Sequence, residues 1–257
     1  MTQLEQFTRD GFLVIPDALS ADQVSALLSA VQRAFNQPSA EADLYHMPDM
    51  WRPKMFEQEQ VFEDLVDNPA VIDLIESVVG NDCHIIANSA LRTTSGKGIS
   101  FWHVDETVRF PRPVDVPLDA RIPMPCFIVN LNYYLCDVDE DLGPTQFVPG
   151  SHRSGRQPRD PEDYAAPDSP VYEGQGVVSA VGKAGTCVMW HDQTWHRGAI
   201  NHTPDRIRWV QQVPYGRRFI AQRFYPFINY TFPEQILARS TPRRQRLFGK
   251  HGLGAYG

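Results

Sequence analysis

Apolar residues recur at helical spacing in the first third of the chain. Behind a capping-box pattern formed by Ser20 and Gln23, they fall at intervals of three or four residues up to Phe35. A second run begins at Asn68-Pro69 and ends at Gly80, with a proline in the first turn and a glycine at the end. An apolar run at 12–15, followed by a proline, predicts a short strand. We expect a mixed, mainly helical segment over residues 1–80.

The pattern of residue types along the chain changes after residue 80. Short runs rich in β-branched and aromatic residues alternate with connections rich in proline, glycine and aspartate. This pattern is typical of a β-sandwich or barrel, here with the helical segment packed against it. The predicted strands lie at 84–93, 99–104, 126–136, 145–149, 177–181, 186–191 and 207–214.

Composition narrows the class of protein. The 24 basic and 31 acidic residues give a formal charge of 24 − 31 = −7, and 42% of residues are hydrophobic, as in soluble globular proteins. Without a basic cluster we expect no nucleic-acid binding, and without a long apolar run no membrane span. The first residues lack the pattern of a secretory signal, and the four cysteines form no C-x-x-C pair. We therefore expect a soluble, cytoplasmic protein with a single domain, as a monomer or homodimer.

The clearest chemical signal is a pair of motifs in the β-rich part. Trp102-His103-Val104-Asp105 places an imidazole and a carboxylate two residues apart, so at the end of a strand both would point to one face. His196 supplies a second histidine further along. Two histidines and a carboxylate form the facial triad of non-haem Fe(II) oxygenases. From these residues alone, two hydrogen-bonded histidines in a sandwich core would be the preferred interpretation.

Two arginines near the last predicted strand add to this signal. An arginine that projects from a strand into a barrel is costly to bury unless it meets an anion, and the distal carboxylate of 2-oxoglutarate is a suitable one. Arg206 and Arg208 share a face of a regular strand. Because Pro204 cannot donate to a sheet, regular pairing should begin after it. We therefore place Arg206 near the rim and Arg208 deeper.

Taken together, these motifs resemble the phytanoyl-CoA dioxygenase family of Fe(II)/2-oxoglutarate oxygenases, which includes ectoine hydroxylases. The resemblance runs through most of the chain and is most specific where a P-G-S-H signature follows the H-x-D motif. The matching segments are 11–16, 102–105, the acidic turn 137–144, 148–152, His196 with Asn201, 205–208 and the tail 247–257.

The resemblance implies a fold, cofactors and a reaction. The fold would be one domain over 1–257, with a double-stranded β-helix (jelly-roll, cupin-like) core at 81–220 flanked by α-helices and a C-terminal extension at 221–257. The cofactors would be Fe(II), 2-oxoglutarate and O2. The reaction would oxidise, most simply hydroxylate, a C–H bond of a small-molecule metabolite, with release of succinate and CO2.

The resemblance also assigns roles to single residues. His103, Asp105 and His196 would be the catalytic iron ligands, and Arg208 would bind the C5 carboxylate of 2-oxoglutarate. Related halogenases replace the carboxylate ligand by a small residue, so Asp105 favours hydroxylation, or desaturation, epimerisation or ring formation, over halogenation. Lys54 resembles a lysine that contacts the co-substrate in some members.

The chain departs from the family at two points. Gly198 stands where many members have a serine that helps to bind the C5 carboxylate. The spacing from the distal histidine to the arginine is usually about eleven residues, whereas Arg206 and Arg208 lie ten and twelve residues after His196. Either departure affects co-substrate binding, and neither removes a metal ligand.

One strand and two long loops are expected to shape the cavity. Asn130, Asn132 and Tyr134 alternate along one face of an otherwise apolar strand, which predicts a lined cavity with Asn132 toward the co-substrate. The loops 106–125 and 153–176 have the length and proline content of mobile covers. Candidate substrate contacts are Arg109, Phe110, Arg112, Arg121, Tyr134 and Tyr164.

Two alternatives stay open at this point. One is a cupin-like metal enzyme that does not use 2-oxoglutarate, and the other is a non-catalytic binding protein on the same scaffold. A core or solvent-facing role without ligand chemistry is expected for the remaining conspicuous side chains: His152, His191, His202, Cys126, Cys136, Cys187, Trp190 and Trp195.

Overall fold

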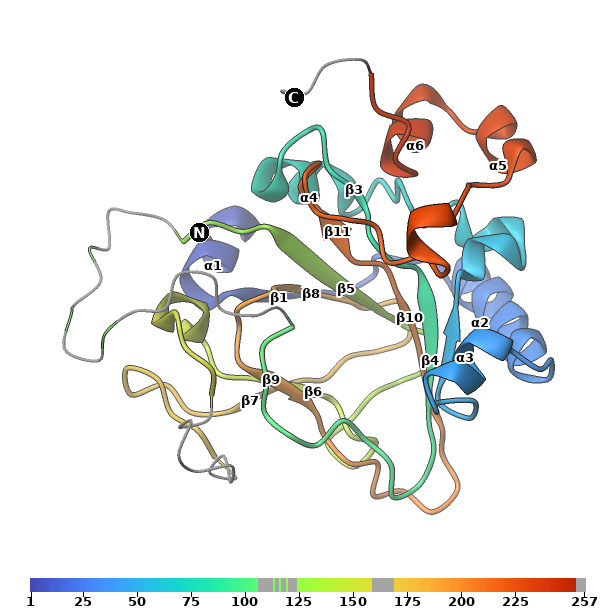
Figure 1. Cartoon of the computed structure of the whole chain (residues 1–257). Coiled ribbons are helices and arrows are strands. Elements are labelled where there is room, and N and C mark those ends of the chain that lie inside the picture. Colours follow the sequence, from blue (N-terminus) through green and yellow to red (C-terminus); the bar gives the residue numbers. More distant parts are fainter. Residues whose placement is uncertain (106–112, 114–115, 117–118, 120–123, 159–168, 253–257) are drawn as a thin grey trace.

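In this computed structural model, the described residues are 1–105, 113, 116, 119, 124–158 and 169–252. They form a mostly antiparallel β protein with helices on one side (Figure 1). The larger sheet has eight strands, six of them in the order β1-β8-β5-β10-β4-β2, with β3 and β11 attached through β5. A smaller sheet has the order β7-β6-β9. The large sheet contains β1 (Phe12–Ile15), β2 (Trp51–Pro53), β3 (His84–Ile85), β4 (Ser89–Thr93), β5 (Ile128–Tyr134), β8 (Cys187–His191), β10 (Arg208–Gln212) and β11 (Tyr215–Gly216), and the small one β6 (Thr145–Phe147), β7 (Val178–Ala180) and β9 (His196–Gly198).

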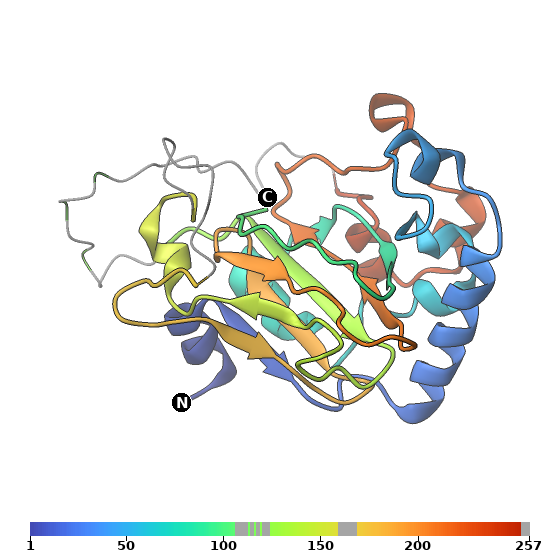
Figure 2. The ribbon, with the colours of Figure 1, turned by 90° about the horizontal axis from the view of Figure 1, so that it is seen from below.

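The two faces of the large sheet have different neighbours. Along β5, Leu131 and Tyr133 belong to the core shared with the helices, whereas Tyr134 belongs to a second apolar cluster with Phe147 of the small sheet. Successive residues of a strand point to opposite faces, so Asn130 and Asn132 share the face of Tyr134. Figure 2 shows the small sheet lying across this inner face. The fold is therefore the expected double-stranded β-helix with flanking helices.

The helices bury the outer face of the large sheet, as the apolar spacing predicted. The Ser20 side chain accepts from the Gln23 amide and the Gln23 side chain from that of Ser20, which completes the capping box of α2. Leu27 and Val31 of α2 pack into the core with Ile75 of α4. The helices are α1 (Gln3–Asp10), α2 (Ala21–Phe35), α3 (Ala40–Leu44), α4 (Ile72–Val79), α5 (Glu234–Arg239) and α6 (Pro242–Leu247), with short 3-10 turns at Met55–Glu57, Gln60–Phe62, Ser151–Ser154 and Phe227–Asn229. Within the part of the chain that the structure describes, no helix has the length and apolarity needed to cross a membrane.

Several predicted boundaries were wrong for local reasons. The Asn68 side chain and carbonyl accept from the next amides and form a turn, so α4 begins only at Ile72. The strand predicted at 207–214 is β10 and ends at Gln212, before Pro214, which has no N–H; a separate short strand, β11, follows the proline. The run 84–93 is also divided, into β3 and β4.

The predicted strand at 99–104 was also wrong. Its backbone forms a single bridge, between His103 and His196, rather than a ladder. The strand that does carry a triad residue, β9, was missed because three residues of mixed polarity give no periodic signal.

Candidate metal and co-substrate site

The structure brings the three predicted metal ligands together. One ligand atom each of His103, Asp105 and His196 lie within 4.8 Å of one another. The Nε2 atoms of His196 and His103 are 3.4 and 3.9 Å from the two carboxylate oxygens of Asp105. The backbones of the two histidines are paired by hydrogen bonds of 3.0 Å in both directions, which sets the two imidazoles side by side.

Backbone carbonyls fix the tautomer of both histidines. His103 Nδ1 lies 2.9 Å from the Phe101 carbonyl, and His196 Nδ1 lies 2.8 Å from the Thr194 carbonyl. Because a carbonyl can only accept, each Nδ1 carries the hydrogen and each Nε2 keeps a lone pair toward Asp105. This is how metal-binding histidines are held, with the second nitrogen donating to an outer partner.

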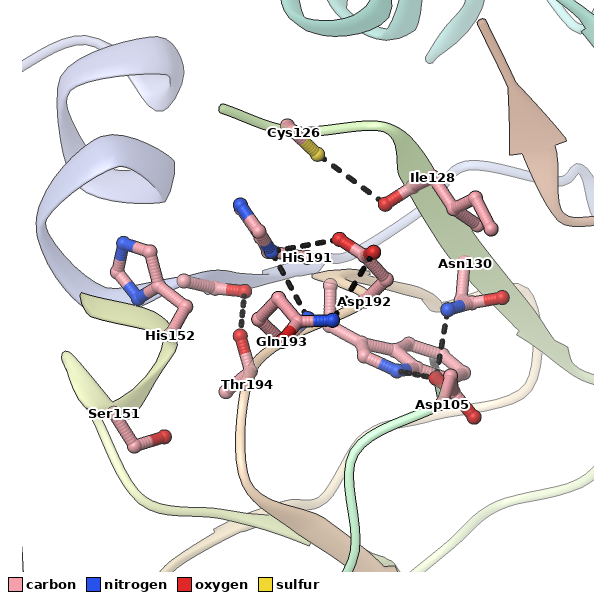
Figure 3. Close-up of polar contacts among 12 residues, drawn as sticks. Asp105, Cys126, Ile128, Asn130, Ser151, His152, His191, Asp192, Gln193 and Thr194 are labelled. Carbon is pink, nitrogen blue, oxygen red and sulfur yellow. Dashed lines mark hydrogen bonds and ion pairs between the residues drawn. The ribbon is translucent and has the colours of Figure 1, made fainter. Parts of the chain in front are cut away.

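The Asp105 carboxylate is oriented by two donors from the inner face of the large sheet. Asn130 Nδ2 and Trp190 Nε1 donate to the same oxygen over 2.7 and 2.8 Å, as Figure 3 shows for Asn130. Burial raises the pKa of Asp105, but His196 and His103, which are positively charged when protonated, and the indole N–H outweigh it and hold the pKa at about 2. The Asp105 carboxyl group is therefore ionised. The sequence predicted that Trp190 packs the core, as it does, but its N–H bond was missed.

The loop before His196 is fixed from two directions. The Asp192 carbonyl accepts the Asp105 amide over 3.0 Å. Ser151, of the P-G-S-H segment, accepts the Trp195 amide through its hydroxyl over 2.8 Å. His152 follows it and lies 3.2 Å from the Thr8 carbonyl through Nε2, in the structural role expected of it. The P-G-S-H segment thus supports the triad from behind without supplying a ligand.

The two arginines occupy the places that the sequence predicted. Arg206 lies at the surface, where it donates to Asp139 over 2.6 Å. Arg208 is 6% exposed and donates from Nη2 to the Thr93 hydroxyl over 3.2 Å. Among the described residues no group accepts from its Nε or Nη1. Burial lowers the pKa of this guanidinium, which therefore lacks the anion that would stabilise its charge.

Asn201 and Gly198 shape the surroundings of Arg208. The buried Asn201 amide donates to the carbonyls of Thr93 and Arg206 over 3.1 and 2.8 Å, which ties the end of β4 to the approach to β10. A Cβ atom at Gly198 would lie 3.4 Å from Nη2 of Arg208. The glycine that departs from the family pattern therefore lies beside the guanidinium.

The other predicted contacts have mixed outcomes. Asn132 faces the inner cavity side and is 6% exposed, and its Oδ1 has no hydrogen-bond partner within the described ranges. Tyr134 does not line a cavity: it is fully buried against Phe147, and its hydroxyl donates to the Ala180 carbonyl over 2.6 Å. Packing between the sheets excludes it as a substrate contact.

The Lys54 side chain contacts two other groups in the structure. Its ammonium donates to the Tyr225 carbonyl and pairs with Glu41, each over 3.0 Å. These contacts do not support the expected co-substrate role. The candidate substrate residues Arg109, Phe110, Arg112, Arg121 and Tyr164, and much of both predicted covers, lie outside the described residues.

Comparison with known proteins agrees with this geometry. The profile of the family described as phytanoyl-CoA dioxygenase (PhyH) matches residues 7–209. The chain is 27% identical over 227 residues to the ectoine dioxygenase of Bordetella bronchiseptica, covering 79% of this chain and 70% of that protein. It is 24% identical over 244 residues to L-proline trans-4-hydroxylase of Streptomyces griseoviridis, covering 82% and 84%.

Solved structures share the fold at low sequence identity. The non-haem alpha ketoglutarate dependent epimerase SnoN from nogalamycin biosynthesis superposes with a TM-score of 0.62 at 20% identity, over 84% of this chain and 82% of that one. HygX from Streptomyces hygroscopicus, with nickel and 2-oxoglutarate bound, gives 0.63 at 18% identity, over 87% and 90%.

Proposed function

This chain belongs to the phytanoyl-CoA dioxygenase family, and from that premise we propose that it hydroxylates a C–H bond of a small-molecule metabolite with Fe(II), 2-oxoglutarate and O2. Relatives named as dioxygenases and hydroxylases of small molecules support this proposal. One observation on the chain itself is the main support for this proposal. Arg208 is buried, two of its donors have no acceptor among the described residues, and it lies beside β9, the strand that carries His196 of the histidine–aspartate–histidine triad.

The side chains present fit an iron ion and its co-substrate. His103, Asp105 and His196 offer two neutral imidazole nitrogens and one carboxylate, the donor set of non-haem Fe(II) oxygenases. Arg208 offers donors in a fixed planar fork, which suits the distal carboxylate of 2-oxoglutarate. When bound, the iron would supply the oxidative decarboxylation of 2-oxoglutarate to succinate and CO2 and the oxidation of the substrate.

The protein contributes binding, orientation and exclusion of water. Asn130 and Trp190 restrain the Asp105 carboxylate, so the ligand set is held before the metal arrives. Arg208 and Thr93 would fix the far end of the co-substrate and thereby its orientation at the iron. Asn132, buried with a free carbonyl oxygen among the described side chains, would accept a hydrogen bond from the bound molecule.

Two alternative functions are less well supported. A cupin-like enzyme that does not use 2-oxoglutarate would leave the buried charge of Arg208 without an anion. A non-catalytic binding protein would have no need for two histidines whose tautomers both present Nε2 to one carboxylate. Hydroxylation is favoured over halogenation because Asp105 occupies the third ligand position.

The proposal is tested by product formation. Iron-reconstituted protein should convert 2-oxoglutarate to succinate slowly without substrate and faster with the right one, always dependent on O2. A panel of polar metabolites, including ectoine- and proline-like compounds, screens for that acceleration, and mass spectrometry of the products should show a gain of one oxygen. The His103→Ala variant is the control. Succinate formation that persists in this variant would refute the assignment.

A further inference from the structure

A second group of potential metal ligands lies directly behind the triad loop. Cys126 precedes β5, and His191 and Asp192 end β8 (Figure 3). Their ligand atoms, a thiol, an imidazole nitrogen and a carboxylate oxygen, lie within 4.8 Å of one another. The three residues are only 6%, 3% and 2% exposed, so bulk water does not solvate this charge.

The hydrogen bonds of this cluster are incomplete. The Gln193 amide donates to His191 Nδ1 over 3.0 Å, and only an unprotonated nitrogen can accept it. Asp192 Oδ1 lies 2.9 Å from the same nitrogen, so the carboxylate, which needs a proton there, and the amide, which needs a lone pair, compete for it. In the described part of the chain, neither Asp192 Oδ1 nor His191 Nε2 has a hydrogen-bond partner.

This arrangement leaves a buried negative charge weakly compensated. The second carboxylate oxygen of Asp192 receives one long bond of 3.4 Å from the neutral Gln193 amide. A buried carboxylate is expensive unless a cation or several donors balance it. A divalent cation would balance the Asp192 carboxylate and a Cys126 thiolate together, with His191 as a neutral third ligand.

The donor set indicates which cation would bind. Sulfur, imidazole and carboxylate ligands together suit Zn²⁺ and its substitute Co²⁺ better than Mg²⁺ or Ca²⁺, which prefer oxygen alone. His152 lies next to the group, with its ring 5.1 Å from that of His191. Its Nδ1 is likewise without a partner among the residues described, but His152 is not one of the three residues whose ligand atoms lie within 4.8 Å of one another.

We propose that Cys126, His191 and Asp192 form a second metal site for a zinc-like cation, separate from the iron triad. We assign the site a structural role because its three ligands are buried away from solvent and from the iron triad. It stabilises the loop whose Asp192 and Thr194 carbonyls accept from Asp105 and His196. This inference does not depend on which reaction the triad catalyses.

The test is a Co²⁺ titration of metal-free protein, followed by absorption spectroscopy and equilibrium dialysis. We expect two bound equivalents and a near-ultraviolet thiolate-to-cobalt charge-transfer band. The triad has no sulfur and cannot produce this band. Cys126→Ser should remove the band and one equivalent. Cys136→Ser is the matched control: its thiol contacts the Ile207 carbonyl instead, so both signals should remain.

Two results would overturn the site. One is a single bound equivalent without a thiolate band in the unaltered protein, which would mean that His191 and Asp192 form a buried ion pair beside a neutral thiol. The other is a band that survives in folded Cys126→Ser protein. The first result needs no variant, so poor folding of Cys126→Ser cannot leave the question open. His103→Ala should lose the other equivalent and keep the band; if it keeps both, the triad assignment fails instead.

Discussion

At the scale of single residues, the two arginines make the sharpest contrast. Arg208 is buried with unused donors, whereas Arg206 is exposed and paired with Asp139. Removing one side of a buried charge pair costs about 2–5 kcal/mol, and the lower end already exceeds tenfold in affinity. Arg208→Ala should therefore raise KM for 2-oxoglutarate more than tenfold. Arg206→Ala should change this KM only by the small factor that corresponds to ~0–1 kcal/mol, the value typical of exposed ion pairs. Saturation curves for 2-oxoglutarate with both variants test this prediction. A larger increase of KM in Arg206→Ala than in Arg208→Ala would assign carboxylate binding to Arg206.

Gly198 gives a second prediction beside the same guanidinium. A serine Cβ would lie 3.4 Å from Arg208 Nη2, close enough for its hydroxyl to reach the carboxylate that Arg208 is proposed to bind. One added hydrogen bond contributes about 1 kcal/mol, or roughly fivefold in affinity. Gly198→Ser should thus bind 2-oxoglutarate more tightly, whereas Gly198→Ala, which lacks the hydroxyl, should not. An equal gain in both variants would show that the hydroxyl is not responsible.

Residue identity explains why the triad was predictable and the surroundings were not. His103 and Arg208 carry chemistry that apolar cores rarely contain, so their presence in predicted strands was itself a signal. Asp105 and His196 lie outside the predicted strands and were identified by their residue types and by the family motifs that they resemble. Trp190 fits a core as well as a donor, and the sequence could not separate these roles. Lys54 matched a motif, but its Glu41 partner comes from a different segment and is invisible to local patterns.

At the scale of elements, the turn between α1 and β1 connects packing to the site. Gly11 has a φ of 79°, and its carbonyl accepts from the His191 amide and the Thr194 hydroxyl. A Cβ there would lie 2.4 Å from His152 Nδ1 and 2.5 Å from the Thr194 hydroxyl oxygen. The turn therefore requires glycine for its conformation and for its neighbours.

Gly11→Ala should destabilise the fold by more than the backbone cost alone. Gly96 is the matched control, since it has a φ of 71° and no atom of the described residues within 4 Å of the added Cβ. Gly96→Ala should cost only the ~1–2 kcal/mol of a left-handed alanine. Urea unfolding of both variants measures the difference, and equal losses would mean that the crowding at Gly11 relaxes freely.

The elements that the sequence placed well are those with long apolar periodicity. α2 buries one regular face, so its periodicity marked it, whereas β5 and β8 are buried along their whole length and were marked by runs rich in β-branched and aromatic residues. β9 and the His103 bridge depend on pairing with each other across a long sequence separation, and no local pattern encodes that. The triad was therefore predicted from its chemistry, while the strand that carries His196 was not.

At the scale of the whole molecule, arginines of the last two helices bind the carboxylates of the N-terminal helical segment. Arg239 of α5 contacts Glu63, whose side chain is fully buried. Arg244 of α6 lies 2.7 Å from Asp67, and Arg243 2.7 Å from Glu76. The C-terminal extension is thus tied to the helices that cover the large sheet (Figure 1).

Arg239→Ala should lower the free energy of unfolding because it leaves the Glu63 carboxylate buried without its partner. Breaking a fully buried pair costs about 3–5 kcal/mol, and the partial exposure of Arg239 reduces this to about 2 kcal/mol. The exposed pair of Arg33 and Glu59 is the control, and Arg33→Ala should cost about 0–1 kcal/mol. Chemical denaturation measures the free energy of unfolding of both variants. Equal losses would show that water reaches Glu63 once the arginine is removed.

The central claim is that one site binds iron and 2-oxoglutarate together. The most direct measurement is anaerobic addition of Fe(II) and then 2-oxoglutarate to the metal-free protein, followed by visible absorption. We predict a metal-to-ligand charge-transfer band that saturates at one 2-oxoglutarate per chain. The band should be absent in Asp105→Ala and should require much more 2-oxoglutarate in Arg208→Ala. The absence of this band in the unaltered protein, with iron shown to be bound, would contradict the account.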